Sequence, residues 1–198
     1  MAVKKKKKMF QTVNYLAAKS GGSVPTMSLL KLVWLSDRLH MRKYGRTVTG
    51  DGYYAMKFGP VATKIYSGLQ DGTFLSSEER AYAGLCFKKV GQYEIASASK
   101  PDLDFFSDSD VDVLDLVYNT FGVKDRFELS EFSHNFPEWS KFERLLKLGT
   151  NKRYEMDLLD FFTDALIDSD FFDQPKETIE FSKKLFQAEL VIDRMYSE

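Results

Sequence analysis

Two acidic residues in the first third of the chain could take part in acid–base chemistry. Asp37 lies within the apolar stretch LLKLVWLSDRLHM (29–41), where helical spacing places it on the same side as Trp34. A carboxylate in apolar surroundings has a raised pKa, which is a property of general acids and bases. Asp51 follows in the glycine-rich turn TGDGYY (49–54), so a pair of catalytic carboxylates can be considered.

The favoured role for Asp37 is structural. An unpaired charge inside a protein is costly, so a buried acid usually ties one element to another through hydrogen bonds. The expected partners of Asp37 are Arg46, Lys57, a hydroxyl of Tyr53 or Tyr54, and the amides of residues 50–52. In this interpretation Asp37 fixes its helix to the glycine-rich turn.

The same turn could bind phosphate, because Gly59 and Pro60 follow it at the expected start of a helix. Helix N-termini attract anions. However, the chain has no G-x-x-x-x-G-K-[ST] pattern, and no G-x-G-x-x-G follows a strand. Pro60 as the first residue of a helix, with Gly59 relieving crowding before it, explains these residues more simply. Nucleotide binding is therefore not favoured.

Metal and nucleophile chemistry have little support. His40 and His134 are the only histidines and Cys86 is the only cysteine, too few for a standard zinc site. DSDVD (108–112) opens like a calcium loop but lacks the later glycine and glutamate, so it is interpreted as a helix cap. His134 and Trp139 are expected to form a packed corner. The sequence thus predicts no catalytic residue, no metal and no cofactor.

The elements that would position these residues are mainly helices. The predicted helices are 10–19, Pro25 to about Lys43, 60–72, 107–122, 128–149 with a break at Pro137, 155–173 and 175–197, and a β-hairpin is predicted at 85–97. The second helix is apolar nearly all round, which is typical of the central helix of a bundle. The expected fold is mainly α within the α+β class: a compact helical domain with a central buried helix and a small β-hairpin.

The chain of 198 residues is long enough for one domain. We divide it into a basic tail (1–9) and a single domain (10–198), whose acidic C-terminal helical region begins at about 155. No apolar run approaches the roughly 20 residues that cross a bilayer. The first residues are too polar for a secretion signal, and the lone cysteine suits a reducing compartment. A soluble, cytoplasmic protein is expected.

The charge is unevenly distributed along the chain. Residues 1–100 hold 17 Lys and Arg against 6 Asp and Glu, whereas residues 101–198 hold 11 against 23. Either the two halves face each other in the fold, or they bind partners of opposite charge. Residues 155–180 carry nine acids, one base and two Phe-Phe pairs. This composition suits docking on a basic protein, in which acids steer the encounter and Phe side chains supply affinity. The alternative is a solvated helix face whose Phe side chains point to the core.

The opening stretch closely resembles the signature of the Panacea domain family, which includes the SocA antitoxin and phage-associated proteins of the GepA type. The blocks that carry the resemblance are KLVWLSDRLHM (31–41), YGRTVTGD (44–51), YYAMKFGPV (53–61), IYSGL (65–69) and LSEFSHNFPEWSKF (129–142). Together they cover most of residues 10–145. The family's motifs name no catalytic residues, so we interpret the matching positions as a scaffold signature: Trp34, Asp37, Gly50, Asp51, Gly59, Pro60, His134 and Trp139.

The resemblance implies a non-enzymatic antitoxin that neutralises a toxin encoded nearby by binding it directly. A basic toxin that acts on RNA or nucleotides would suit the acidic segment. The candidate toxin-binding residues are Asp160, Phe161, Asp164, Asp168, Phe171 and Phe172. Three alternatives stay open. The chain could be an adaptor that delivers the toxin to a protease, as SocA does. It could also be a phage protein that binds nucleic acid through its basic first half, or an enzyme.

Overall fold

The computed structural model of the chain describes residues 2–70, 75–167 and 170–195. Its α-helices are α1 (Ala2–Lys19), α2 (Thr26–Tyr44), α3 (Thr63–Leu69), α4 (Ser77–Cys86), α5 (Asp108–Phe121), α6 (Arg126–Ser133), α7 (Pro137–Ser140), α8 (Glu143–Leu148) and α9 (Lys176–Met195). Its 3-10 helices are η1 (Leu103–Phe105), η2 (Leu158–Phe162) and η3 (Asp170–Phe172). Its strands are β1 (Ser23–Pro25), β2 (Tyr53–Met56), β3 (Gly59–Ala62), β4 (Phe87–Val90), β5 (Glu94–Ser97) and β6 (Arg153–Glu155).

These strands form small antiparallel sheets among the helices. One sheet has the order β1-β5-β4 and the other the order β3-β2-β6. The predicted mainly helical α+β fold is therefore confirmed. The hairpin predicted at 85–97 is β4 and β5, and β1 joins it as a third strand through pairs such as Val24 with Ile95.

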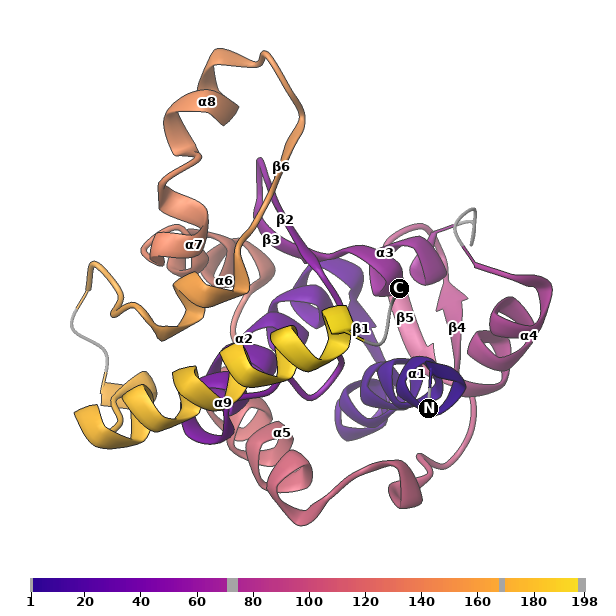
Figure 1. The fold of residues 1–198 in the computed structure, drawn as a ribbon. Coiled ribbons are helices and arrows are strands. Elements are labelled where there is room, and N and C mark those ends of the chain that lie inside the picture. The colour runs from indigo at the N-terminus through magenta and orange to yellow at the C-terminus, as the bar shows by residue number, and fades with distance from the viewer. Residues whose placement is uncertain (1, 71–74, 168–169, 196–198) are drawn as a thin grey trace.

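Helix α2 is the centre of the molecule, as its apolar sequence predicts. Every residue from Ser28 to Arg42 is buried. The helix contacts α1, α5, α6, α9 and the β2–β3 hairpin, and Figure 1 shows it in the middle of the fold with α9 across its front. It ends at Gly45, which adopts a left-handed φ of 69° while its amide donates to the Met41 carbonyl.

The first helix begins at Ala2, so the lysine run lies in its first turns. Lysine is a good helix former. Buried Met9 and Phe10 anchor the following turn in the core. In addition, Lys8 forms an ion pair with Asp110 of α5 at 2.6 Å. The predicted helix over 10–19 is thus correct but too short.

Pro60 does not begin a helix, which corrects the prediction for residues 59–60. It lies in β3, which pairs with β2 through Met56 opposite Gly59 and Ala55 opposite Pro60. Because β3 is an edge strand of its sheet, the missing amide of a proline is tolerated there. Gly59, with a φ of 98°, closes the tight turn, and α3 starts only at Thr63.

The acidic region 155–173 was predicted to be helical, and this is wrong for most of its length. It consists of the end of β6, the 3-10 helices η2 and η3, and irregular backbone between them. The carbonyl groups of Phe161 and Phe162 accept hydrogen bonds from Arg42 on α2 rather than from later amides of their own segment. The predicted C-terminal helix is confirmed as α9, in which the apolar residues Leu185 and Ile192 are exposed.

The helices α5 and α4 both begin at a capping box, in which the side chains of residues near the helix start bond to main-chain amides. Ser107 and Asp110 form a reciprocal capping box at the start of α5, as the acidic cap predicts. Ser76 and Glu79 form the same device at α4, a helix that we did not predict. Downstream, Pro137 interrupts the helical stretch as expected, and it becomes the first residue of the short helix α7.

Candidate functional site

Asp37 is fully buried and its carboxylate is occupied by the loop that follows α2. One carboxylate oxygen accepts the amides of Val48 at 2.8 Å and Thr49 at 3.0 Å. The other accepts the Tyr53 hydroxyl at 2.8 Å and the hydroxyl of Thr49. Burial raises the pKa of Asp37 to about 6, against the opposing effect of these hydrogen bonds. Of the predicted partners, Tyr53 is present, whereas the amides come from residues 48–49 instead of 50–52.

Asp51 holds the start of α3. Its carboxylate accepts the amides of Lys64 and Ile65 at 2.9 Å each, and that of Gly52 at 2.8 Å. It is nearly inaccessible to solvent, and burial raises its pKa. The N-terminus of α3 is the place where a phosphate would bind. The carboxylate of Asp51 occupies that position, so the turn does not form a phosphate-binding site. Asp37 and Asp51 therefore form two separate structural contacts and do not act as a pair.

The two signature glycines differ in their surroundings. Gly50 has a φ of 69°, and a Cβ added to it would meet nothing within 4 Å. Gly59 has a φ of 98°, and a Cβ there would lie 2.2 Å from Ser133 Oγ and 2.7 Å from Lys31 Cε. The neighbouring Pro60 carbonyl accepts a hydrogen bond from Lys31 Nζ at 2.9 Å. The β2–β3 turn is therefore packed directly against α2 and α6.

The aromatic signature residues pack against the same hairpin. The rings of His134 and Trp139 stack with centroids 3.7 Å apart. Trp139 Nε1 donates to the Met56 carbonyl at 2.8 Å, which joins α7 to β2. Trp34 is buried and meets the Phe136 ring edge to face at 4.9 Å. The expected packed corner around His134 and Trp139 is present.

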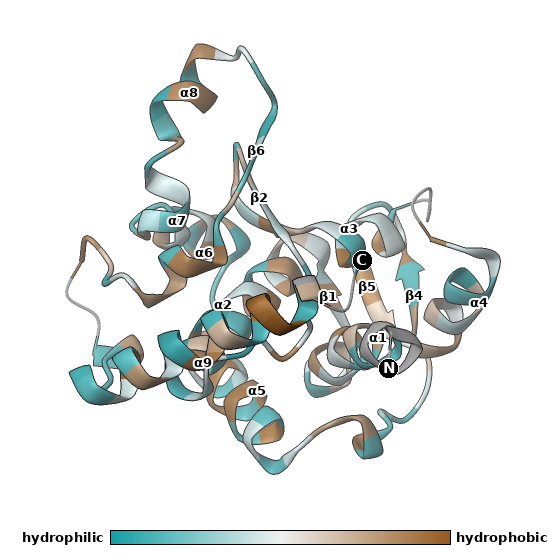
Figure 2. Ribbon diagram, viewed as in Figure 1, coloured by the Kyte–Doolittle hydropathy of each residue, from teal (hydrophilic) through white to brown (hydrophobic). Residues whose placement is uncertain are grey.

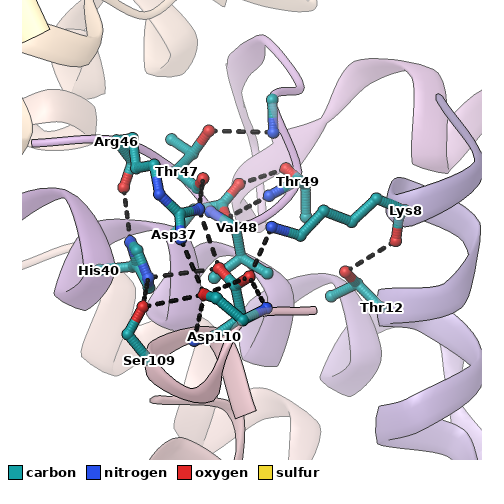
Figure 3. A network of polar contacts seen from close by, with 12 residues as sticks. Lys8, Thr12, Asp37, His40, Arg46, Thr47, Val48, Thr49, Ser109 and Asp110 are labelled. Atoms are coloured by element: carbon teal, nitrogen blue, oxygen red, sulfur yellow. Dashed lines mark hydrogen bonds and ion pairs between the residues drawn. The ribbon is translucent and has the colours of Figure 1, made fainter. Parts of the chain in front are cut away.

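A further polar cluster joins the basic first half to the acidic second half (Figure 3). Asp110 of α5 accepts hydrogen bonds from Lys8 at 2.6 Å and Arg46 at 2.9 Å. Burial alone would raise the pKa of Asp110, but these bonds and the Ser107 amide outweigh it and lower the pKa to about 2. His40 lies 3.3 Å from Asp110, yet burial and the Arg46 charge lower its pKa to about 4, so it is neutral at pH 7. In this cluster, therefore, the basic first half of the chain contacts the acidic second half.

Two buried arginines on α2, which the sequence analysis missed, hold the acidic segment. Arg42 donates from Nε to the Phe172 carbonyl at 2.9 Å and from Nη1 to the Phe162 carbonyl at 2.9 Å. The same Nη1 also reaches the carbonyls of Phe161 and Thr163. Arg38 forms a buried ion pair with Glu138 at 2.9 Å. The available signal was a pair of arginines four residues apart in a helix whose other residues are mostly apolar.

Burial of the phenylalanines corrects their predicted role. Phe161 and Phe172 are buried in the core, so they cannot provide the contact surface expected of them. Phe171 is half-buried and meets the Phe121 ring edge to face at 4.8 Å. The Arg38 guanidinium lies over the Phe172 ring at 4.9 Å. The alternative interpretation, in which these side chains point to the core, is the correct one for Phe161 and Phe172.

Two of the acidic candidates, Asp160 and Asp164, lie at the surface. Asp160 is partly exposed and forms an ion pair with Lys141. The Asp164 side chain is 81% exposed, and its carboxylate is 2.6 Å from Arg42 Nη2. Asp168 lies outside the described residues. Leu166, two residues after Asp164, is 72% exposed and is an apolar side chain in acidic surroundings.

The fold and its buried clusters define a compact α+β scaffold in which Asp37 and Asp51 form structural contacts. Within the described residues, no group of three or more His, Cys, Asp or Glu side chains is placed to hold a metal ion. The helices in the same part of the chain include none that is long and apolar enough to cross a membrane.

The chain belongs to the Panacea domain family. The family model described as antitoxin SocA-like, Panacea domain, matches residues 29–140, which run from α2 to α7. Membership of this antitoxin family implies a cognate toxin as partner. Searches of curated proteins and of solved structures gave no significant match. The acidic segment and α9 lie beyond the matched residues, and Arg38 and Arg42 attach that segment to the matched part.

Proposed function

We propose that this protein is a non-catalytic antitoxin that neutralises its cognate toxin by binding it directly. The proposed contact region is the acidic surface, formed by Asp157, Asp160, Asp164, Asp170 and Asp173. The observation that carries this proposal is the attachment of the acidic segment to the buried Arg42 through several carbonyl groups. Dense like charges oppose folding, and here they are held at the surface of a fixed scaffold.

The fixed backbone gives this surface a binding advantage. Arg42 forms hydrogen bonds with residues 161–163 and with residue 172, so these two parts of the chain lie close together. The acids that flank them therefore lie on the same part of the molecule. A surface that is already ordered loses less entropy when it binds. The acids would steer a basic toxin toward it. Leu166 takes over, as an exposed apolar anchor, the role first assigned to Phe161 and Phe172. A toxin that binds RNA or nucleotides would need a basic surface, which would be complementary to these acids.

The test reverses charges that are exposed and lie outside the ion pairs of Asp160 and Asp164. Asp170→Lys with Asp173→Lys is compared with a control, Glu78→Lys with Asp112→Lys, which changes net charge equally at exposed acids of α4 and α5. At low salt, the first variant should associate with the toxin about tenfold more slowly, with a weaker salt dependence. The control should retain most of the wild-type rate.

Two measurements follow this comparison. Association rates of purified toxin and antitoxin are recorded at low and high salt, and growth is scored when both proteins are co-expressed from neighbouring genes. Equal rates for both variants would remove the acidic surface as the contact region. Loss of toxin control on deletion of a host protease, with no stable complex, would show that the chain is an adaptor and not a direct inhibitor.

A further inference from the structure

A pocket of about 550 Å³ lies between the first half of α2, the β2–β3 hairpin, α3 and the segment around α8. Figure 2 shows β2 and α8 in the upper part of the view, with apolar positions on α8. The walls of the pocket are mostly apolar and include Met27, Leu30, Met56, Val61 and Leu146. Its volume is within the range of cavities that bind small molecules. The pocket shares no residue with the acidic surface, so it is a separate site.

Lys31 is a buried lysine in the wall of this pocket. It is 1% exposed, and its Nζ donates to the Pro60 carbonyl at 2.9 Å. Within the described part of the chain it has no other hydrogen bond and no ion pair, whereas Arg38 and Arg42 on the same helix each contact a carboxylate. Burial lowers the pKa of Lys31 to about 7, because water no longer stabilises the charged form. Buried charges are normally paired, so a ligand that enters the pocket could supply the missing counter-charge.

The entrance of the pocket carries further positive charge. Lys57 and Lys152 line it and are exposed, and neither forms an ion pair with any described residue. Phe58 lies beside them and is 50% exposed, with Lys57 Nζ over its ring at 5.4 Å. The described residues that line the pocket include no Asp or Glu. The entrance therefore attracts anions and repels cations.

We propose that this pocket binds a small molecule with an apolar body and a single carboxylate. The carboxylate pairs with Lys31 Nζ, and the apolar body fills the space between Met27, Val61 and Leu146. One negative charge fits better than the two of a phosphate, because Lys31 is the only buried cation among the described lining residues. A protein segment fits less well, because its main-chain amides would lack partners against apolar walls. This inference does not depend on the proposed function, since it concerns a small molecule at a different site.

The test is calorimetric titration of the full chain without toxin, with decanoate as the probe and decanol as the uncharged ligand of equal chain length. Decanoate is kept below the concentration at which it forms micelles. Wild type should bind decanoate with a dissociation constant on the order of 10 µM, and decanol at least tenfold more weakly. Lys31→Met should abolish this difference, because methionine is apolar and of similar length but has no charge. The control Lys88→Met, at an exposed lysine of β4, should behave like wild type.

Proton uptake on binding gives a test that needs no variant. Because the pKa of Lys31 is about 7, its amine is mostly neutral at pH 8. A bound carboxylate raises that pKa again, so binding at pH 8 should take up close to one proton per ligand. Titrations in buffers of different ionisation enthalpy measure this uptake.

Other titratable groups around Lys31 must be separated from it. His134 senses the Lys31 charge, and burial lowers its pKa, so it is neutral at pH 8. The other titratable residues that line the pocket are Lys57, Tyr66, Tyr93 and Lys152. If Lys31 is the group that takes up the proton, the uptake should disappear in Lys31→Met.

Three outcomes would contradict the proposal. Wild type that does not bind decanoate, or binds it no better than decanol, would overturn it. Decanoate binding without proton uptake would place the carboxylate at the exposed Lys57 and Lys152 and overturn the role of Lys31. Absence of decanoate binding by wild type, together with loss of toxin binding in a folded Lys31→Met variant, would overturn it in favour of a segment of the toxin. Circular dichroism checks that each variant is folded.

Discussion

Replacing Arg42 with methionine removes the attachment of the acidic segment while keeping a side chain of similar length. Arg42 is buried and donates to the carbonyl groups of Phe161, Phe162, Thr163 and Phe172. It also contacts the carboxylate of Asp164. Methionine fills much of the same space but donates no hydrogen bond. The variant therefore measures the contribution of the Arg42 hydrogen bonds to stability while most of the side-chain packing is retained.

The expected loss of stability follows from those contacts. A buried carbonyl left without a partner costs about 1–3 kcal/mol, whereas the loss of the contact with the exposed Asp164 costs at most about 1 kcal/mol. Part of this cost is offset because the guanidinium no longer has to be buried, and because the segment can relax toward water. We therefore expect a net destabilisation of about 3 kcal/mol. With a urea slope of about 2 kcal/mol per molar, the unfolding midpoint should fall by about 1.5 M.

The assay combines urea unfolding with amide hydrogen exchange. Exchange should accelerate first in residues 158–167 and 170–173, because these lose their attachment to α2. Asp164→Ala is the control, since its side chain is 81% exposed and such surface ion pairs contribute at most about 1 kcal/mol. If the Arg42 variant unfolds at the wild-type midpoint with unchanged exchange in this segment, the reasoning about the carbonyl contacts is wrong.

Two further predictions concern the signature residues. Gly59→Ala should lower stability by more than about 2 kcal/mol, because its Cβ would meet Ser133 and Lys31, whereas Gly50→Ala, with open space around it, should cost only about 1 kcal/mol. Thermal unfolding of both variants checks the order, and equal losses would contradict it. Burial raises the pKa of Asp37 to about 6 from 3.8, so the native state binds the extra proton and this residue's contribution to stability declines as pH rises through that window. The difference in free energy of unfolding between wild type and Asp37→Asn, measured by urea unfolding, should therefore change by on the order of 2–3 kcal/mol between pH 4 and pH 7, and a constant difference would refute the raised pKa.

Features set by local pattern were predictable from the sequence. The apolar run around Trp34 identified the central helix, and the Ser-Asp cap identified the start of α5. The burial of Asp37 followed from its neighbours on the helix, because a helix without a polar side leaves an acid no access to water. These inferences needed only residues within a few turns of one another.

Features set by distant contacts were not predictable. Pro60 has the same preferred φ in a helix start as in an edge strand, so only its pairing with Ala55 decided between them. The acidic segment carries helix-like apolar spacing, but its carbonyls bond to an arginine 120 residues earlier in the chain. Likewise, the lysine run gives no sign that Lys8 meets Asp110, 102 residues away.

The way in which Arg42 holds the acidic segment has a consequence for how the chain can diversify. Its hydrogen bonds reach main-chain carbonyls of residues 161–163 and 172, and every amino acid carries such a group. Outward-pointing side chains such as Leu166 and Asp170 can therefore be exchanged without detaching the segment. The main chain of this segment is held in place by Arg42, whereas its exposed side chains can change. Substitutions can therefore alter the chemistry of this surface without altering the fold that supports it.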